Sequence, residues 1–194
     1  MVHILIEELE NFAHENKVPI MQKDGIEFLI DYIKKNNVIN ILEIGTAIGY
    51  SSIRMALLDK NIKITTIERN DKMFSFAVNN IKKIGLDNQI KVIHDDALNV
   101  SLNEKFDLIF IDAAKSQYIK FFNNFKDNLE DNGVIISDNL SFHGLVSNIS
   151  NTNNRNTKQL VRKIKNYIEF LKTNNEYETT FYELGDGVAI TKKA

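Results

Sequence analysis

Short apolar runs alternate with longer segments of helical spacing along most of the chain. Five runs rich in β-branched residues predict strands at 39–44, 62–68, 90–94, 106–111 and 133–137. Their nearly continuous apolar content is typical of strands buried on both faces, as in a parallel sheet. The segments between them predict helices at 51–60, 71–85 and 116–133, and the last two end in glycine, a common helix stop. Repeated units of this kind predict a doubly wound α/β sheet with right-handed crossovers.

The end of the chain departs from this alternation. Residues 177–184 and 188–193 have strand-like composition, and the Gly-Asp-Gly turn at 185–187 separates them. Its two glycines are free to take positive φ, which suits a tight turn. We expect an antiparallel hairpin at the edge of the otherwise parallel sheet. Residues 147–157 are expected to form a polar loop, and the absence of a repeat or linker predicts a single domain over residues 1–194.

Composition narrows the class of protein. The chain has 194 residues, of which 43% are hydrophobic, enough for one domain with a substantial core. Its net charge of −2 argues against a general polyanion binder, and the absence of cysteine excludes thiolate metal sites and cysteine nucleophiles. The N-terminus does not have the pattern of a signal peptide, and no apolar stretch approaches the roughly 20 residues that span a bilayer. We therefore expect a cytoplasmic protein with no membrane partner.

A glycine loop follows the first predicted strand and leads into a helix, which is where open α/β sheets bind ligands. A dinucleotide fingerprint starting at Gly45 would need glycine where Ala47 and Tyr50 stand. Since the second glycine of that fingerprint lets the backbone approach a pyrophosphate, Ala47 argues against NAD. What remains is a tight turn, Glu43-x-Gly45-x-x-x-Gly49, without a cradle for a diphosphate.

Acidic residues at the next two strand ends suit a nucleoside. Glu68 ends the second strand and could accept hydrogen bonds from both ribose hydroxyls, while Asp96 and Ala97 follow the third strand, where an adenine ring would lie. A nucleoside site without a phosphate site suits S-adenosylmethionine, and Glu43 could attract its cationic methionine end. The alternative is that the glycines only shape a turn and that Glu68 is a solvated strand end.

Oxygen-bearing side chains also end the fourth and fifth strands. Asp112 follows the fourth strand, and Asp138 and Asn139 follow the fifth, so neighbouring strands would bring them to one rim. Two carboxylates and an amide oxygen form a ligand set suited to Mg²⁺ or another divalent cation. Lys115 lies three residues after Asp112 and could serve as a general base. The alternatives are that Asp138 caps a turn, that Asn139 serves a loop, and that Lys115 is an ordinary surface lysine.

The segment 155–172 combines a core-facing stripe with strong positive charge. It holds six basic residues and one acid. Lys158, Arg162 and Lys165 share one face, with Arg155 in the loop before them, and such a basic stripe could contact RNA phosphates. The commoner meaning of this pattern is a solvated amphipathic helix. His143, in the loop after Asn139, could touch substrate, although an ordinary loop residue is the simpler interpretation. The residues expected to face the core are Val161, Ile164, Ile168 and Leu171.

Several of these segments together resemble a known family. ILEIGTAIGYSS, ITTIERN, DDAL, LIFIDAAKSQY and IISDNLSFHGLV are similar to motifs of the cation-dependent O-methyltransferases of the caffeoyl-CoA and catechol type. NRNTKQLVRKIKNY and YETTFYELGDGVAIT look most like the bacterial tRNA 5-hydroxyuridine methyltransferases of that group. The resemblance extends from Val18 onward; only 17 residues precede it, where members of the group carry a further helical segment.

The resemblance implies a Rossmann-like methyltransferase fold, a homodimer, and conversion of 5-hydroxyuridine to 5-methoxyuridine at the tRNA wobble position. It implies Asp112, Asp138 and Asn139 as ligands of Mg²⁺ or another divalent cation, and Lys115 and Asp112 as catalytic residues. Arg155, Lys158 and Arg162 would contact RNA. Two other hypotheses remain: a methyltransferase for small vicinal-hydroxyl substrates such as catechols, and a non-catalytic nucleoside-binding domain. The residues implied to bind S-adenosylmethionine are Met21, Glu43, Gly45, Ser51, Glu68, Asp96, Ala97 and Asp112.

Overall fold

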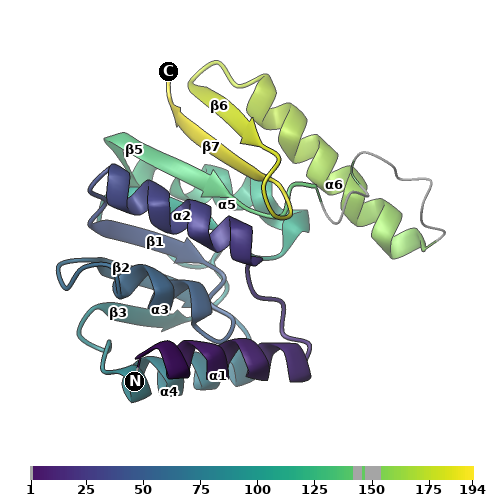
Figure 1. Ribbon diagram of the computed structural model, residues 1–194. Coiled ribbons are helices and arrows are strands. Elements are labelled where there is room, and N and C mark those ends of the chain that lie inside the picture. The colour runs from purple at the N-terminus through teal and green to yellow at the C-terminus, as the bar shows by residue number, and fades with distance from the viewer. Residues whose placement is uncertain (1, 142–145, 147–153) are drawn as a thin grey trace.

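A computed structural model describes residues 2–141, 146 and 154–194, and within them the chain forms one seven-stranded sheet (Figure 1). Five strands run parallel: β1 (Asn40–Ile44), β2 (Lys63–Glu68), β3 (Ile90–His94), β4 (Phe106–Ile111) and β5 (Leu129–Ser137). The antiparallel hairpin of β6 (Tyr177–Tyr182) and β7 (Val188–Lys193) pairs with β5 through β7. The order β3-β2-β1-β4-β5-β7-β6 confirms the doubly wound sheet and its edge hairpin.

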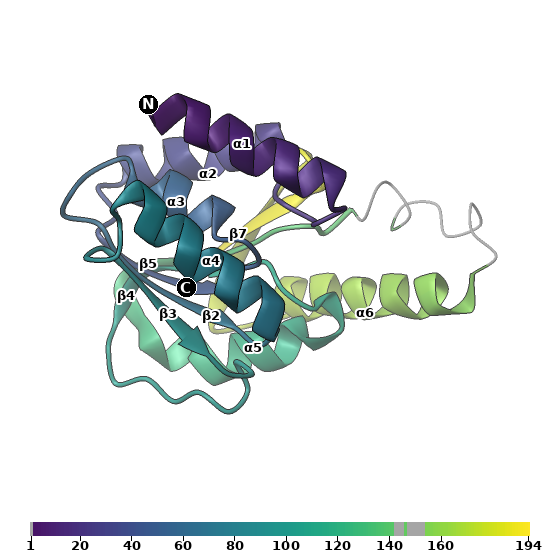
Figure 2. The same ribbon diagram turned by 90° about the horizontal axis from the view of Figure 1, so that it is seen from below.

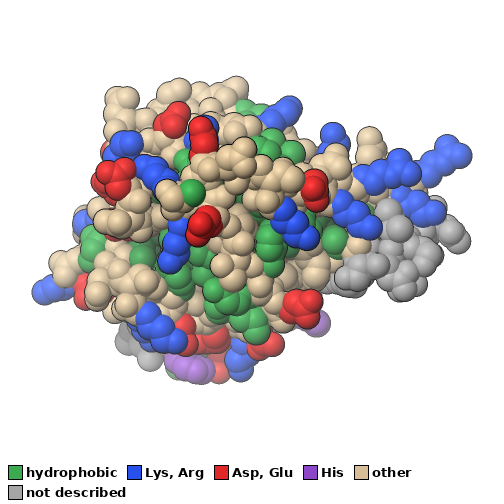
Figure 3. Space-filling model, turned by 90° about the horizontal axis from the view of Figure 1, so that it is seen from above, with side chains coloured by type: hydrophobic (Ala, Val, Ile, Leu, Met, Phe, Trp, Pro, Cys, Tyr) green, Lys and Arg blue, Asp and Glu red, His purple; other side chains and the backbone are tan. Residues whose placement is uncertain are grey.

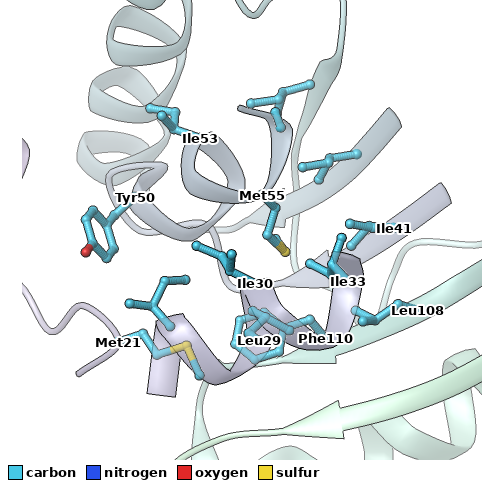
Figure 4. Packing of buried hydrophobic residues seen from close by; sticks show 14 of the residues in the cluster. Met21, Leu29, Ile30, Ile33, Ile41, Tyr50, Ile53, Met55, Leu108 and Phe110 are labelled. Atoms are coloured by element: carbon cyan, nitrogen blue, oxygen red, sulfur yellow. The ribbon is translucent and has the colours of Figure 1, made fainter. Parts of the chain in front are cut away.

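Helices cover both faces of this sheet. The first face carries α1 (Val2–Glu15), α2 (Lys23–Lys35), α3 (Tyr50–Ala56) and α4 (Asp71–Ile84), and the second carries α5 (Tyr118–Phe125) and α6 (Arg155–Lys172). Successive strand residues point to opposite faces, so Ile41 packs with α2 and α3 (Figure 4), whereas Leu42 packs with α5 and α6. Both strand side chains are fully buried, and burial of each contributes about 1.5–3 kcal/mol. Of the described helices, none is long and apolar enough to cross a membrane.

Side-chain caps and glycine fix the ends of two helices that matter for the site. Asn70 accepts hydrogen bonds from the backbone N–H groups of Lys72 and Met73 and so starts α4. Gly85 ends this helix in the left-handed conformation, as the sequence predicted. The Asn154 side chain caps α6 in the same way, which is why this helix begins at Arg155 although the surrounding sequence is polar.

The predicted helix over 116–133 is wrong beyond its first half. A 3₁₀ turn, η1 (Lys115–Gln117), precedes α5, a second turn, η2 (Lys126–Asn128), follows it, and β5 already begins at Leu129. Gly133 therefore lies inside a strand, where the register against β4 shifts. A Cβ atom at Gly133 would lie 3.0 Å from the Phe106 carbonyl oxygen, so glycine here permits the close approach of two strands rather than a helix stop.

Candidate functional site

A cavity of about 250 Å³ opens at the carboxyl ends of the parallel strands. It lies where the sheet order reverses between β1 and β4, the usual ligand position in such sheets. Lys115 and Asn139 from the predicted catalytic and metal sets line it as well. Seven of the eight predicted cofactor residues line the cavity, namely Met21, Gly45, Ser51, Glu68, Asp96, Ala97 and Asp112.

Gly45 joins the cofactor cavity to the end of β4. Its φ is +100°, and a Cβ atom at this position would lie 2.1 Å from the backbone oxygen of Asp112. The Asp112 N–H in turn donates to the Ile44 carbonyl oxygen at 3.0 Å. Only glycine fits this turn, because any other residue would collide with the neighbouring backbone. The position of Asp112 is therefore tied to the glycine loop.

Glu68 is held in place at the end of β2 by backbone groups. Its two carboxylate oxygens accept hydrogen bonds from the Ala47 N–H at 2.9 Å and from the Asn70 N–H at 2.8 Å. Ala47 has a φ of 47°, which aims its N–H at this carboxylate. Each carboxylate oxygen can accept a second hydrogen bond, so the group can still bind two hydroxyls of a ribose in the cavity.

Glu43 is the predicted cofactor residue that does not line the cavity. It is fully buried, and its carboxylate accepts hydrogen bonds from the hydroxyls of Ser51, Ser52 and Thr66, the last at 2.6 Å. Burial raises the pKa of Glu43 to about 7, and the three hydroxyl bonds partly oppose this shift. The Glu43 side chain thus links the start of α3 to β2. Its predicted attraction for the methionine end of S-adenosylmethionine would act through Ser51, which lies between Glu43 and the cavity.

The loop after β3 places the Asp96 side chain at the wall of the cavity. Asp96 is half-buried; one of its oxygens accepts from the Leu98 N–H at 3.0 Å, and the other accepts from Arg69 at 3.3 Å. Arg69 also lines the cavity, although it was not predicted as a site residue. Its position in the sequence, directly after Glu68, could have indicated that it lies in the site.

Asp112, Asp138 and Asn139 lie together, as their positions at the ends of β4 and β5 predicted. The Asp138 N–H donates to the Ile111 carbonyl oxygen at 3.2 Å, which brings the two strand ends level. The Asn139 side-chain amide donates to Asp112 at 2.8 Å and to Asp138 at 3.0 Å. Asn139 has a φ of 65°, a left-handed conformation that turns its side chain back toward both carboxylates.

The electrostatics of this cluster suit a cation. Burial raises the pKa of Asp112 and raises that of Asp138 to about 7, and the charge of Asp112 adds to the second shift. A half turn of the Asn139 amide would present its oxygen beside the two carboxylates, giving the oxygen-only set that Mg²⁺ prefers. Among the described residues no three His, Asp or Glu side chains could hold a metal, so the Asn139 amide is the candidate for a third protein ligand beside the two carboxylates.

Lys115 begins η1 at the edge of the same cluster. Its positive charge lowers the pKa of Asp112 and of Asp138, which places it within electrostatic range of both carboxylates. Tyr118, the first residue of α5, is buried, and its hydroxyl donates to the Asp138 carbonyl oxygen at 3.1 Å. Sequence reasoning missed Tyr118, because an aromatic residue at the start of a helix is most often a core residue.

The β6–β7 turn closes the cluster from the other side. The Asp186 carboxylate accepts from the Ser141 hydroxyl at 3.0 Å, and its backbone oxygen accepts from the Ser141 N–H at 2.7 Å. Asp186 is buried, and its charge contributes to the raised pKa of both Asp112 and Asp138. The sequence predicted only a turn here, because the contact joins segments 45 residues apart.

The predicted RNA-contact residues lie on α6, which packs against η1. Arg155 and Arg162 are exposed, Lys158 is half-buried, and Arg155 is the first residue of the helix rather than part of the loop. Of the residues expected in the core, Val161, Ile164 and Leu171 are buried and Ile168 is half-buried. Lys and Arg side chains gather where this helix projects beyond the sheet (Figures 2 and 3). His143 lies outside the described residues.

Comparison with known proteins agrees with this geometry. The O-methyltransferase family model matches residues 2–194. A catechol O-methyltransferase from Niastella koreensis is 31% identical, with 75% of this chain and 66% of that protein covered. A caffeoyl-CoA O-methyltransferase from Populus kitakamiensis is 29% identical, with 88% of this chain and 76% of that protein covered.

Solved structures show the same fold. A Staphylococcus aureus protein provisionally assigned as a caffeoyl-CoA O-methyltransferase has a TM-score of 0.93 and 42% identity, covering 97% of this chain and 92% of its own. An O-methyltransferase from Bacillus cereus in complex with SAH has a TM-score of 0.82 and 25% identity, covering 98% and 90%. These matches leave no support for a non-catalytic domain. The chain has the Rossmann-like methyltransferase fold, belongs to the O-methyltransferase family, and is an S-adenosylmethionine-dependent methyltransferase.

Proposed function

We propose that the protein methylates one oxygen of a vicinal pair with the help of a divalent cation, and that its acceptor is 5-hydroxyuridine at the wobble position of tRNA. The observation that carries this proposal is the carboxylate pair of half-buried Asp112 and buried Asp138, bridged by Asn139 and flanked by Lys115, at the wall of the cofactor cavity. A base and a cation site beside a methyl donor are the two requirements for deprotonating and orienting a hydroxyl group.

The cavity residues would bind and orient S-adenosylmethionine, which supplies an electrophilic methyl group. Glu68 would accept the ribose hydroxyls, while Asp96 and Ala97 would border the adenine ring. Met21 and Ser51 line the same cavity and are assigned to the cofactor as well. Holding both reactants in one partly enclosed site contributes much of the acceleration, since it removes the entropic cost of bringing them together.

Asp112, Asp138 and the Asn139 amide oxygen would hold a divalent cation, preferably Mg²⁺, which would lower the pKa of the substrate hydroxyl and fix its neighbouring oxygen. Lys115, once it has lost its own proton, would accept the hydroxyl proton at Nζ and become an ammonium group. The oxygen would then form a bond to the methyl carbon as the bond from that carbon to sulfur breaks, giving SAH, and the lysine would release its proton to solvent. Charge balances because the positive charge lost by the sulfonium equals the one gained by the lysine.

The choice of acceptor rests on α6. A 5-hydroxyuracil presents adjacent O4 and O5 atoms, just as a catechol presents its vicinal pair, so the cluster alone suits both. The six basic residues of α6 lie on a helix that packs against η1, the turn that begins with Lys115. That placement supports a polyanionic acceptor. The names of the catechol and caffeoyl-CoA relatives favour the second candidate, a small vicinal-hydroxyl acceptor.

One assay separates the two candidates. Purified protein is incubated with S-adenosylmethionine, Mg²⁺ and tRNA that carries 5-hydroxyuridine, and the digested nucleosides are identified by mass spectrometry. A parallel reaction contains a simple catechol. Chelator-sensitive conversion to 5-methoxyuridine with little catechol turnover supports the tRNA proposal; catechol methylation with unchanged tRNA would replace it with the small-molecule one.

Two further expectations depend on this proposal or on family resemblance. A tRNA acceptor implies action in the cytoplasm. The resemblance also implies a homodimer, which light scattering of the purified protein tests directly, since a mass near 22.3 kDa would contradict it.

A further inference from the structure

A groove of about 720 Å³ lies between α6 and the β6–β7 hairpin, outside the cofactor cavity. Lys165, Glu169 and Lys172 line it from the helix, and Phe181 and Glu183 line it from the hairpin. Its volume falls within the range of small-ligand sites, about 300–1,000 Å³. The cofactor and cation proposals above leave this groove without a role.

The groove reaches the segment that directly follows the cation cluster. Leu140 and Ser141, the two residues that follow Asn139, are among the residues that line it. The Leu140 N–H donates to the Gly187 carbonyl oxygen at 3.0 Å, and Gly187 also lines the groove. The hairpin turn is therefore fixed against the segment that carries Asn139. A polymer whose reactive unit lies at the cluster can place its next unit in the groove.

Positive charge follows the helix wall. Lys158, Arg162, Lys165, Glu169 and Lys172 recur at intervals of three or four residues, so they lie on one face of α6 with neighbouring Cβ atoms about 5–6 Å apart. Four of the five are cations. The stripe predicted to contact RNA thus continues into the groove, and a polyanion along it would meet successive cations.

An exposed aromatic ring lies opposite these lysines. Phe181 is 37% exposed on the edge strand β6, and the Lys172 ammonium lies 5.7 Å from its ring centre. Aromatic rings bind nucleic-acid bases by stacking, and adjacent cations bind the linking phosphates. The ring and the ammonium group therefore offer both contacts that one nucleotide needs.

We propose that this groove binds the nucleotide adjacent to the methylated one in a single-stranded RNA loop, with its base against Phe181 and the phosphates on either side of it at Lys165 and Lys172. Glu183, on the hairpin wall, keeps phosphates on the lysine side by repulsion. Glu169 lies between the two lysines and can accept a hydrogen bond from an exocyclic amino group of the base. This inference rests on the proposed tRNA function and assigns the neighbouring base a site of its own.

The test compares two acceptors with one set of variants. One acceptor is an RNA hairpin with a single 5-hydroxyuridine in its loop; the other is the free nucleoside 5-hydroxyuridine, which cannot reach the groove. Phe181→Leu removes the stacking ring but keeps an apolar side chain, and Phe181→Trp retains stacking. Lys165→Glu combined with Lys172→Glu reverses the phosphate site. Lys163→Glu makes one such charge reversal, half of the change in the double variant, at an exposed position of α6 that does not line the groove.

We expect Phe181→Leu and the double lysine variant to raise KM for the hairpin about tenfold or more, in line with the loss of one stacked base or its phosphate contacts. Phe181→Trp and Lys163→Glu should stay within about twofold of the wild type. For the free nucleoside, kcat/KM should be unchanged in every variant. Thermal unfolding of each variant checks that the fold is intact.

Two results would overturn the groove proposal while leaving the proposed function intact. In the first, Phe181→Leu and the double lysine variant methylate the hairpin as well as the wild type does. In the second, these variants lose as much activity on the free nucleoside as on the hairpin. If the wild type methylates a catechol but neither RNA acceptor, the proposed function fails and the groove proposal fails with it. The wild-type reaction and the variant series therefore report on the two proposals separately.

Discussion

The two ends of the carboxyl edge of the sheet are built in different ways. At the β1–β2 end, backbone groups and short buried contacts hold the site: Gly45 touches the Asp112 backbone, and two N–H groups fix Glu68. At the β5–β7 end, beyond the cation cluster, long and mostly exposed side chains of α6 face an open groove. The first construction tolerates little change, whereas the second can vary without disturbing the fold. We therefore propose that methyl transfer depends mainly on the first region and acceptor choice on the second.

Asp138 lies on the border between the two regions, and its replacement should have the largest effect. Asp138→Ala removes one of two carboxylates proposed to hold the cation, so we expect methyl transfer to fall about a thousandfold or more. Calorimetry should show S-adenosylmethionine affinity within about twofold of the wild type. Asp131→Ala is the matched control, because Asp131 is exposed on the same strand and its carboxylate accepts a hydrogen bond from Lys193, away from the cluster. Full activity of Asp138→Ala in chelator would contradict the cation mechanism.

The rigidity of the cofactor end is tested by a pair of glycine variants. Gly45→Ala places a Cβ against the Asp112 backbone at a φ of +100°, so we expect it to cost about 3 kcal/mol or more and to abolish cofactor binding. Gly85→Ala also has a positive φ, +77°, but its Cβ would meet nothing within 4 Å, so the cost should be about 1–2 kcal/mol. Urea unfolding measures both. Equal losses would show that backbone conformation, and not contact between the two loops, sets the requirement.

Glu43 makes the stability of the cofactor end depend on pH. Burial disfavours its charged form and raises its pKa from the ordinary glutamate value of 4.5 to about 7 in the folded protein. The folded state therefore binds more protons than the unfolded state between these values, and stability falls as pH rises from about 4.5 to 7 and is then constant. We expect Glu43→Gln to weaken that decline by about 1–3 kcal/mol, measured by urea unfolding at several pH values. Parallel pH curves for variant and wild type would show that Glu43 is charged in the folded protein.

The acceptor end should respond more mildly. Arg162→Glu should lower the affinity for tRNA about three- to tenfold and reduce its dependence on salt, while cofactor affinity stays the same. Lys163→Glu, one residue along on a different face, should have a smaller effect. Filter binding at several salt concentrations measures both. If Arg162→Glu changed neither affinity nor the salt slope, the stripe on α6 would be a solvated surface.

The same contrast determines what could be predicted from sequence. Buried strands and their polar ends are local signals, so Asp112, Asp138 and Asn139 could be placed on one rim before the structure was known. Gly133 misled, because a glycine at a helix end and a glycine at a strand irregularity have the same sequence context. The burial of Glu43 beneath Ser51, Ser52 and Thr66 depends on the packing of α3 on β2.

Contacts between the hairpin and earlier parts of the chain escaped prediction. The bond between Ser141 and Asp186 joins the segment after β5 to a turn in the hairpin, and nothing local in either segment indicates the other. The groove opposite α6 has the same origin, since one wall is a helix and the other an edge strand. The charge of α6 could be read from the sequence, but the aromatic ring that faces its lysines could not.

The central claim is that Asp112, Asp138 and Asn139 hold a divalent cation beside the cofactor. Titration with Mn²⁺, followed by electron paramagnetic resonance in the presence of SAH, tests it without relying on turnover. The account predicts a single bound ion per chain in the wild type and in Asp131→Ala, and loss of that ion in Asp138→Ala. No bound ion in the wild type, or equal binding in Asp138→Ala, would contradict it.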